Sequence, residues 1–290
     1  MVPQARRALS PTAAVGRIGK LSLEYVRRDG RTVFGRTHCQ TPWHLLPPIY
    51  LDETGSAYTL LVNPSGGLVG GDHVLIDLSV GPEAHVLIST PSANRVYRSV
   101  SKASVQDIRV SVGTQGRLEW FPEHTIPFSG SRFRQSIDVA LAPGAVLLFW
   151  DAMASGRIAR GERWAFTSLE NRIRISTACG DTASEHYAID REPKRRTISL
   201  MEEWDYLGSL FIIGDSVGSA IWNRLEVLLA EILETQRGEV LGGVSQPAAP
   251  GLVVKLVAKS APVLSDVLSG LWGAARRALW NLPPVLLRKY

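Results

Sequence analysis

A Gly-x-Ser-x-Gly motif at residues 214–218 is the pattern in this sequence with the most direct link to catalysis. Apolar residues 210–213 precede it and a helical pattern follows it, which is the setting of the nucleophile elbow in α/β-hydrolases. Ser216 would then attack an ester, and an acid and a histidine later in the chain would complete the triad. The last histidine is His186, so this chain order cannot be met. The alternative is a strand-to-helix turn in which Asp215 or Ser216 caps the helix.

The segment 63–72, Asn-Pro-Ser-Gly-Gly-Leu-Val-Gly-Gly-Asp, contains enough glycine to raise the question of a phosphate cradle. A P-loop needs Gly-Lys-Ser/Thr before a helix, and a dinucleotide fingerprint needs Gly-x-Gly-x-x-Gly before one. Here a strand pattern follows at 73–80, so neither motif fits. We interpret the segment as a strained turn with Asp72 at its exit, where a carboxylate beside glycine can also offer weak, open oxygen ligation to a metal ion.

Histidines and cysteines do not form a recognisable metal site. None of the six histidines is paired with another at the i, i+4 spacing of a helical site. Only His38, Cys39 and His44 cluster, and this mixed group beside prolines lacks the spacing of a closed site. Cys39 and Cys179 are too few for a disulfide framework and are typical of reduced thiols. We therefore expect no permanently bound cofactor or metal.

Two other segments, 119–128 and 150–164, are dense in polar and aromatic residues without matching a known catalytic set. Their charged side chains include Glu123, Asp151, Arg157 and Glu162. Opposite charges at these spacings can satisfy each other near a core, with Arg157 paired either with Glu162 or with Asp151.

The elements that position these residues are strands over most of the chain. Alternating apolar and polar residues predict short strands, and Asp29-Gly30 predicts a tight hairpin turn. Similar turns at 80–84, 112–116 and 141–145 recur at intervals of about 30 residues. No internal sequence repeat is found, so a solenoid of similar units is not evident. The expected strands after the hairpin lie at 57–62, 72–80, 85–90, 104–112, 117–121, 132–141, 145–150, 163–169 and 172–177.

The last third of the chain changes to helical spacing. Apolar residues recur every three to four positions and predict helices near 219–237 and 262–280, with a strand at 252–258 between them. We expect a flexible amino-terminal segment at 1–16 and one domain at 17–290, strand-rich over 17–213.

Composition and charge limit the function further. With 45% hydrophobic and 20% charged residues, the sequence is typical of a globular protein, and no apolar run is long enough for a membrane span. The net charge of +5 is spread along the chain, which does not favour nucleic acid as a partner. No apolar stretch follows Arg6 and Arg7, so no export signal is expected. The cytoplasm is the expected location.

In chain order, these segments resemble the urease accessory protein family UreD, also called UreH. The resemblance lies in the glycine-rich segment 63–72, in Val-Tyr-Arg-Ser at 96–99, in Pro-Glu-His-Thr-Ile-Pro-Phe at 122–128, and in Asp151 with the following Gly-Arg and Gly-Glu pairs. It covers most of residues 17–200. The carboxyl-terminal residues 271–284 are a looser match.

The resemblance implies a mainly β fold: an irregular, layered, β-helix-like arrangement of many short strands, with two α-helices in the carboxyl-terminal third. It also implies a non-enzymatic scaffold and urease maturation factor, which binds apo-urease together with UreF and the GTPase UreG and supports nickel insertion. Nickel would be handled only transiently. A serine hydrolase that uses Ser216 is the alternative.

Residue by residue, Asp72, Asp151, Arg157 and Glu162 match the polar positions of the family's motifs, and Glu123 belongs to its Pro-Glu motif. The resemblance makes these five residues candidates for a transient nickel path or a partner surface. Carboxylates are hard oxygen donors, which suit relay of Ni²⁺ better than storage. The sequence departs from the family pattern at Ser65, at Asn94 and at its end, 285–290, so carboxyl-terminal contacts are less well supported than the glycine-rich segment.

Overall fold

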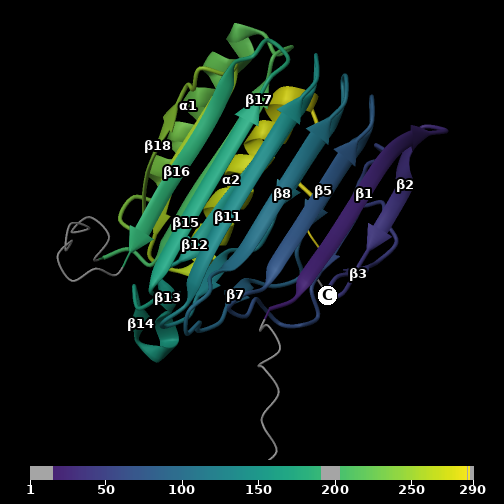
Figure 1. Ribbon diagram of the computed structural model, residues 1–290. Coiled ribbons are helices and arrows are strands. Elements are labelled where there is room, and N and C mark those ends of the chain that lie inside the picture. The colour runs from purple at the N-terminus through teal and green to yellow at the C-terminus, as the bar shows by residue number, and fades with distance from the viewer. Residues whose placement is uncertain (1–15, 191–202, 286, 288–290) are drawn as a thin grey trace, which may run out of the picture.

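The computed structural model describes residues 16–190, 203–285 and 287. Two β-sheets stack face to face, and two helices cover the second sheet, which makes three layers (Figure 1). Residues 1–15 of the expected flexible segment lie outside the described residues. Within the described part, no helix is long and apolar enough to cross a membrane.

The first sheet has seven strands, and its five inner strands are parallel. Burial alternates along them, because one face packs against the second sheet and the other faces solvent. In spatial order the strands are β16 (Thr182–Asp190), β15 (Ser168–Ser176), β11 (Arg132–Leu141), β8 (Ser104–Val112), β5 (His73–Val80), β1 (Ile18–Arg28) and β2 (Arg31–Cys39).

The second sheet is buried on both faces, which explains its nearly continuous apolar strands. In spatial order its main strands are β18 (Val240–Ser245), β19 (Gly251–Ala258), β17 (Tyr206–Gly214), β12 (Val146–Ala154), β9 (Arg117–Phe121), β6 (His85–Ser89), β4 (Ala57–Val62) and β3 (His44–Leu45). Two short strands, β7 (Asn94–Val96) and β10 (Thr125–Pro127), pair beside them.

From β4 to β15 the chain alternates between the two sheets and adds one parallel strand to each in turn, as in the coils of a β-solenoid. The short turns between coils stack on one another. The amide of Gly113 donates to Val80 O at 2.7 Å, and the amide of Ala142 donates to Val112 O at 2.9 Å. The expected layered β-helix-like fold is therefore confirmed. What repeats along the chain is the spacing of the turns. The residues themselves do not repeat, because inward positions require only apolar side chains of suitable volume.

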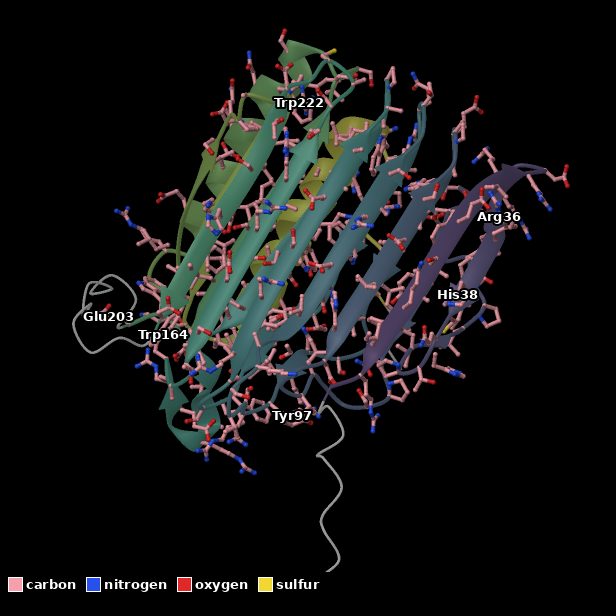
Figure 2. The ribbon with its side chains drawn as sticks, viewed as in Figure 1. Arg36, His38, Tyr97, Trp164, Glu203 and Trp222 are labelled. Atoms are coloured by element: carbon pink, nitrogen blue, oxygen red, sulfur yellow. The ribbon has the colours of Figure 1, made fainter. Side chains whose placement is uncertain are left out.

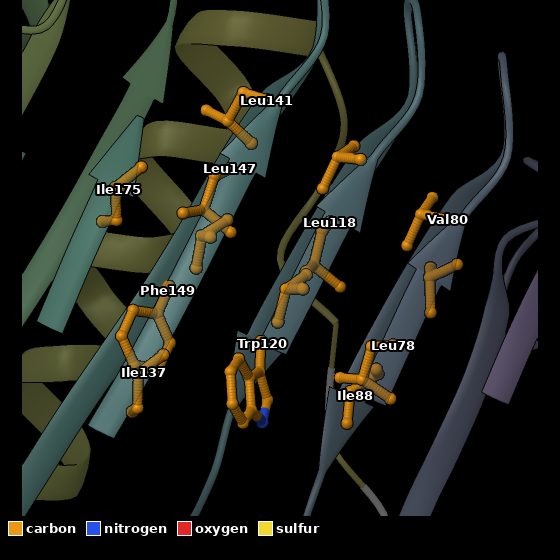
Figure 3. Close-up of a cluster of buried hydrophobic side chains, with 14 of the residues drawn as sticks. Leu78, Val80, Ile88, Leu118, Trp120, Ile137, Leu141, Leu147, Phe149 and Ile175 are labelled. Atoms are coloured by element: carbon orange, nitrogen blue, oxygen red, sulfur yellow. The ribbon is translucent and has the colours of Figure 1, made fainter. Parts of the chain in front are cut away.

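Two large apolar cores and a smaller one, which includes Phe133, Met153 and Phe166, are found among the described residues. One large core lies between the sheets and includes Leu118, Trp120 and Phe149 (Figure 3). The other large core lies between the second sheet and the expected helices, α1 (Ser219–Thr235) and α2 (Ala261–Trp280). Burial of apolar surface on both sides of the second sheet is the main force that positions the helices.

Some sequence-based expectations at the level of elements are wrong. The strand expected at 163–169 is not formed: a hairpin of β13 (Gly156–Arg157) and β14 (Glu162–Arg163) ends there, and residues 168–176 form the single strand β15. A short 3-10 helix, Ile158–Arg160, joins β13 and β14. The strands β16 and β18 were not expected. Both are edge strands with exposed or half-exposed positions, which weakens their apolar pattern.

Candidate functional site

The long loops of the solenoid gather at one end of the molecule. Because the parallel strands of the two sheets run in opposite directions, the loops 63–72, 90–103, 122–131 and 155–167 all connect the sheets at the same end, the lower edge in Figure 1. We call this the loop end; the short stacked turns form the opposite end. Apart from Asp151, the segments that carried the family resemblance in residues 63–164 contribute to the loop end.

Asp72 lies at the loop end and binds backbone. One of its oxygens, Oδ1, accepts the amide of Arg17 at 2.9 Å, and Oδ2 accepts the amide of Val69 at 2.8 Å. The carboxylate therefore ties the glycine-rich segment to the chain just before β1. This geometry supports the interpretation of the segment as a turn with an acidic exit.

Arg157 and Glu162 form a two-pronged ion pair across the β13–β14 hairpin, with Arg157 Nε donating to Glu162 Oε2 at 2.8 Å and Arg157 Nη2 donating to Oε1. The guanidinium lies 4.1 Å above the centre of the Phe128 ring. The pair lowers the pKa of Glu162, mainly through the hydrogen bond from Arg157. Of the two partners left open by the sequence, Glu162 is the one that binds Arg157.

Asp151 occupies a different place, in the interior between the sheets. It is carried by β12 of the second sheet and is bound by two amides of the first: Gln135 Nε2 donates to Oδ1 at 3.0 Å, and Asn171 Nδ2 donates to Oδ2 at 2.9 Å. Gln135 also donates to Asn171 Oδ1 at 2.9 Å and accepts from Gln106 Nε2 at 2.9 Å. We call Gln106, Gln135, Asn171 and Asp151 the polar row.

The polar row follows from the solenoid register. Gln106, Gln135 and Asn171 are register partners on β8, β11 and β15, so their side chains stand in one line across the inner face of the first sheet. The pKa of Asp151 is raised to about 7, mainly by burial; the nearby carboxylate of Glu185 adds to the rise, and the hydrogen bonds from Gln135 and Asn171 oppose it. Glu185 itself accepts Ser209 Oγ at 2.8 Å and lies 3.0 Å from Lys255 Nζ.

Asp151 lines two cavities. The inner cavity, about 90 Å³, lies between the sheets; its lining includes Gln106, Gln135, Asp151 and Glu123. The outer cavity, about 430 Å³, lies where β16 faces β17 and β19; its lining includes Asp151, Glu185 and Lys255. Of the five candidate residues, the structure thus brings Asp151 and Glu123 to one cavity.

The motif at 214–218 forms a strand-to-helix turn, but the expected helix cap is wrong. Helix α1 has Gly218 at its N-cap, with no side-chain cap. Asp215 Oδ1 instead accepts the amide of Gly144 at 2.9 Å and so ties this turn to a solenoid turn. Ser216 is exposed, and within the described residues it has no hydrogen bond to a histidine.

A buried charged cluster was missed by the sequence analysis. Glu119 is fully buried. Its carboxylate accepts hydrogen bonds from Arg276 Nη1, at 2.5 Å, and from Trp272 Nε1. The Oε1 atom of Glu119 also lies 2.7 Å from His85 Nε2. Arg276 Nη2 also lies 3.3 Å from Asp52 Oδ2. Arg276 Nε donates to the backbone carbonyl of Pro283, which follows α2, at 3.0 Å. A signal was present, because a glutamate within the apolar run of β9 needs a buried partner.

Together, the fold and the candidate site define a layered β-solenoid protein with a polar row inside. Its described residues contain no group of three or more His, Cys, Asp or Glu side chains able to hold a metal ion. The sequence pattern of the UreD urease accessory protein family matches residues 17–289. The chain therefore belongs to the UreD family.

Individual relatives cover nearly all of the chain. A urease accessory protein UreD of Picosynechococcus sp. is 30% identical over 276 residues, 93% of each chain. One from Deinococcus radiodurans is 32% identical over 280 residues, 94% of this chain and 95% of the relative. One from Sorangium cellulosum is 35% identical over 257 residues, 88% of this chain and 80% of the relative. The chain is thus similar to these proteins over almost its full length.

Proposed function

We propose that this chain is a non-enzymatic scaffold of urease maturation, which binds apo-urease together with UreF and UreG in the cytoplasm while nickel is inserted. The observation that carries the proposal is the match to the UreD family over residues 17–289, with relatives similar along nearly the whole chain. Its partners are proteins, and we propose no role for nucleic acid or a membrane.

The interior supports transient handling of nickel as cargo. Asp151 lines both cavities and Glu123 lines the inner one, so two carboxylates border one cavity. Oxygen donors bind Ni²⁺ more weakly than imidazole or thiolate ligands, which favours release. We propose Asp151 and Glu123 as candidates for the nickel path. Asp72, Arg157 and Glu162, which lie at the loop end, are candidates for contact with a partner.

Genetic complementation tests the proposed function. A host that contains a urease operon with its UreD gene deleted should regain urease activity and urease-bound nickel when this chain is expressed with the UreF, UreG and urease of its own source. With an empty vector in place of this chain, urease activity and urease-bound nickel should both remain at the level of the deletion strain. Failure to restore either one, despite soluble expression of all components, would contradict the proposal.

The hydrolase alternative makes a different prediction. If Ser216 were a nucleophile, the purified chain would turn over generic esters, and Ser216→Ala would abolish that turnover. We expect no turnover by either protein, and we expect Ser216→Ala to support urease activation as the unchanged chain does. Ester hydrolysis that disappears with Ser216→Ala would restore the alternative.

A further inference from the structure

The loop end carries an exposed apolar tip. Val100 is 94% exposed and Val69 is 46% exposed, and they lie on loops joined by backbone contacts. The amide of Leu68 donates to Arg95 O at 2.8 Å, and the amide of Gly71 donates to Ala103 O at 3.2 Å. We call Val69 and Val100 the apolar tip.

The surface around the tip extends to the β13–β14 hairpin through stacked side chains. Tyr97, labelled at the lower edge of Figure 2, packs edge-on against Phe128 with ring centres 5.0 Å apart, and Phe128 lies beneath Arg157. Glu162 also accepts the amide of Ser129 at 3.1 Å. The loops and the hairpin therefore form one connected face.

Exposed cations on this face include Arg95, Arg98, Lys102 and Arg160. We call them the basic rim. None has a carboxylate within ion-pair distance among the residues that the structure describes, although Arg160 contributes to the lowered pKa of Glu162.

Nearby carboxylates do not neutralise the basic rim. Asp72 accepts hydrogen bonds from two backbone amides. Glu162 forms an ion pair with Arg157, and Asp205 forms one with Arg163. The described part of this face therefore carries cations without an ion-pair partner together with two exposed valines. Such a face fits a partner surface that has apolar and acidic groups, because apolar contacts supply affinity and charges supply orientation and speed of association.

We propose that the basic rim and the apolar tip dock an acidic protein surface of the maturation complex, an inference that rests on the proposed function. The exposed valines on the same face as the cations favour a protein occupant, because a protein surface can supply apolar contacts as well as acidic groups. A polyanion such as nucleic acid would use the charges alone and leave the apolar tip exposed.

Charge reversal tests the proposal. We would measure the affinities of the purified full-length chain for UreF, UreG and apo-urease at low and moderate ionic strength. The double variant Arg98→Glu/Lys102→Glu should bind one of these partners at least about tenfold more weakly at low salt, with a smaller dependence on salt. Val100→Ser should weaken binding to the same partner without changing its salt dependence.

The matched control is Arg224→Glu/Arg277→Glu, which reverses two exposed arginines of the helix layer and should bind as the unchanged chain does. Thermal unfolding of all variants would establish that they fold, and the substituted side chains at the loop end are exposed.

If every partner binds the loop-end variants and the control equally, the docking surface is wrong while the proposed function stands. If the unchanged chain binds none of the three partners, the proposed function itself fails. Binding of duplex DNA or anionic vesicles through the rim, with protein binding unaffected, would also overturn the docking surface.

Discussion

Asp151 differs from the other candidate carboxylates because it lies between the two sheets, where no cation among the described residues compensates its charge. Among the described residues, it has hydrogen bonds from Gln135 and Asn171 but no arginine or lysine within ion-pair distance. Burial therefore raises its pKa from an ordinary 3.8 to about 7. Such a group exchanges protons near neutral pH, and a carboxyl group must lose its proton before it binds a metal ion.

The raised pKa has a defined effect on stability. Between pH 4 and pH 7 the folded state holds a proton on Asp151 that the unfolded state has lost, so the free energy of unfolding falls as pH rises through this window. The limiting slope is about 1.4 kcal/mol per pH unit. We expect Asp151→Asn to remove this fall, measured as the difference in unfolding free energy between pH 5 and pH 8. An unchanged pH dependence would contradict the assignment. The control is Asp77→Asn, a substitution on the exposed face of the first sheet.

For nickel delivery, the same Asp151→Asn variant should form the complex with partners as the unchanged chain does, but yield urease with less nickel. The amide keeps the shape of the side chain and loses the negative charge. Size-exclusion chromatography of the complex and the nickel content of purified urease are the measurements. Normal nickel content would exclude a relay role for Asp151. Loss of complex formation would show that its role is structural.

At the scale of elements, helix α2 is attached to the second sheet by charge as well as by apolar packing. Arg276 on α2 is fully buried and reaches Glu119 on β9, 157 positions away in the chain. The same glutamate binds Trp272, one turn earlier on the helix. A misplaced helix would leave these groups buried without partners, so the cluster favours one position of α2 on the sheet.

A double-mutant cycle measures this attachment. Glu119→Leu leaves Arg276 with a single carboxylate, that of the partly exposed Asp52 at 3.3 Å, and should lower the free energy of unfolding by about 3–5 kcal/mol in urea. Glu119→Leu combined with Arg276→Met should cost less than the sum of the two single changes, because the double variant leaves no unpaired charge between them. Arg277→Met, an exposed neighbour, is the control and should change stability by less than about 0.5 kcal/mol. Additive losses would show that the two residues act independently.

For the whole molecule, the solenoid leaves surfaces that a partner can cover. Strands β2 and β16 are the two edges of the first sheet, and β18 is an edge of the second, with Leu241 57% exposed. Exposed edges and apolar side chains favour self-association when no partner covers them. Stability and solubility should therefore depend on partner binding.

Co-expression tests this dependence. The soluble yield of the chain should increase several-fold when UreF is produced in the same cells, and the two should elute together in size-exclusion chromatography. An unrelated soluble protein expressed at the same level is the control and should not raise the yield. A chain that is monodisperse alone and does not associate with UreF would contradict the central claim of the scaffold proposal.

Local features of the structure were predictable from the sequence. The Asp29-Gly30 hairpin, most strands of both sheets and the two late helices follow from turn chemistry and apolar periodicity, which act over a few residues. Residues 163–169 were misjudged because β13 and β14 form a separate hairpin, and the edge strands β16 and β18 have patterns too weak to detect.

The candidate site was predictable only as a set of residues. Their chemistry was visible in the sequence, but only the register of parallel strands aligns Gln135 with Asn171 and brings both to Asp151. Only the opposite directions of the two sheets gather the loops at one end. The pairing of Glu119 with Arg276 likewise depends on where α2 packs. These contacts join residues far apart in the chain, and the free energy that selects them comes from burial of the whole core, which no local pattern contains.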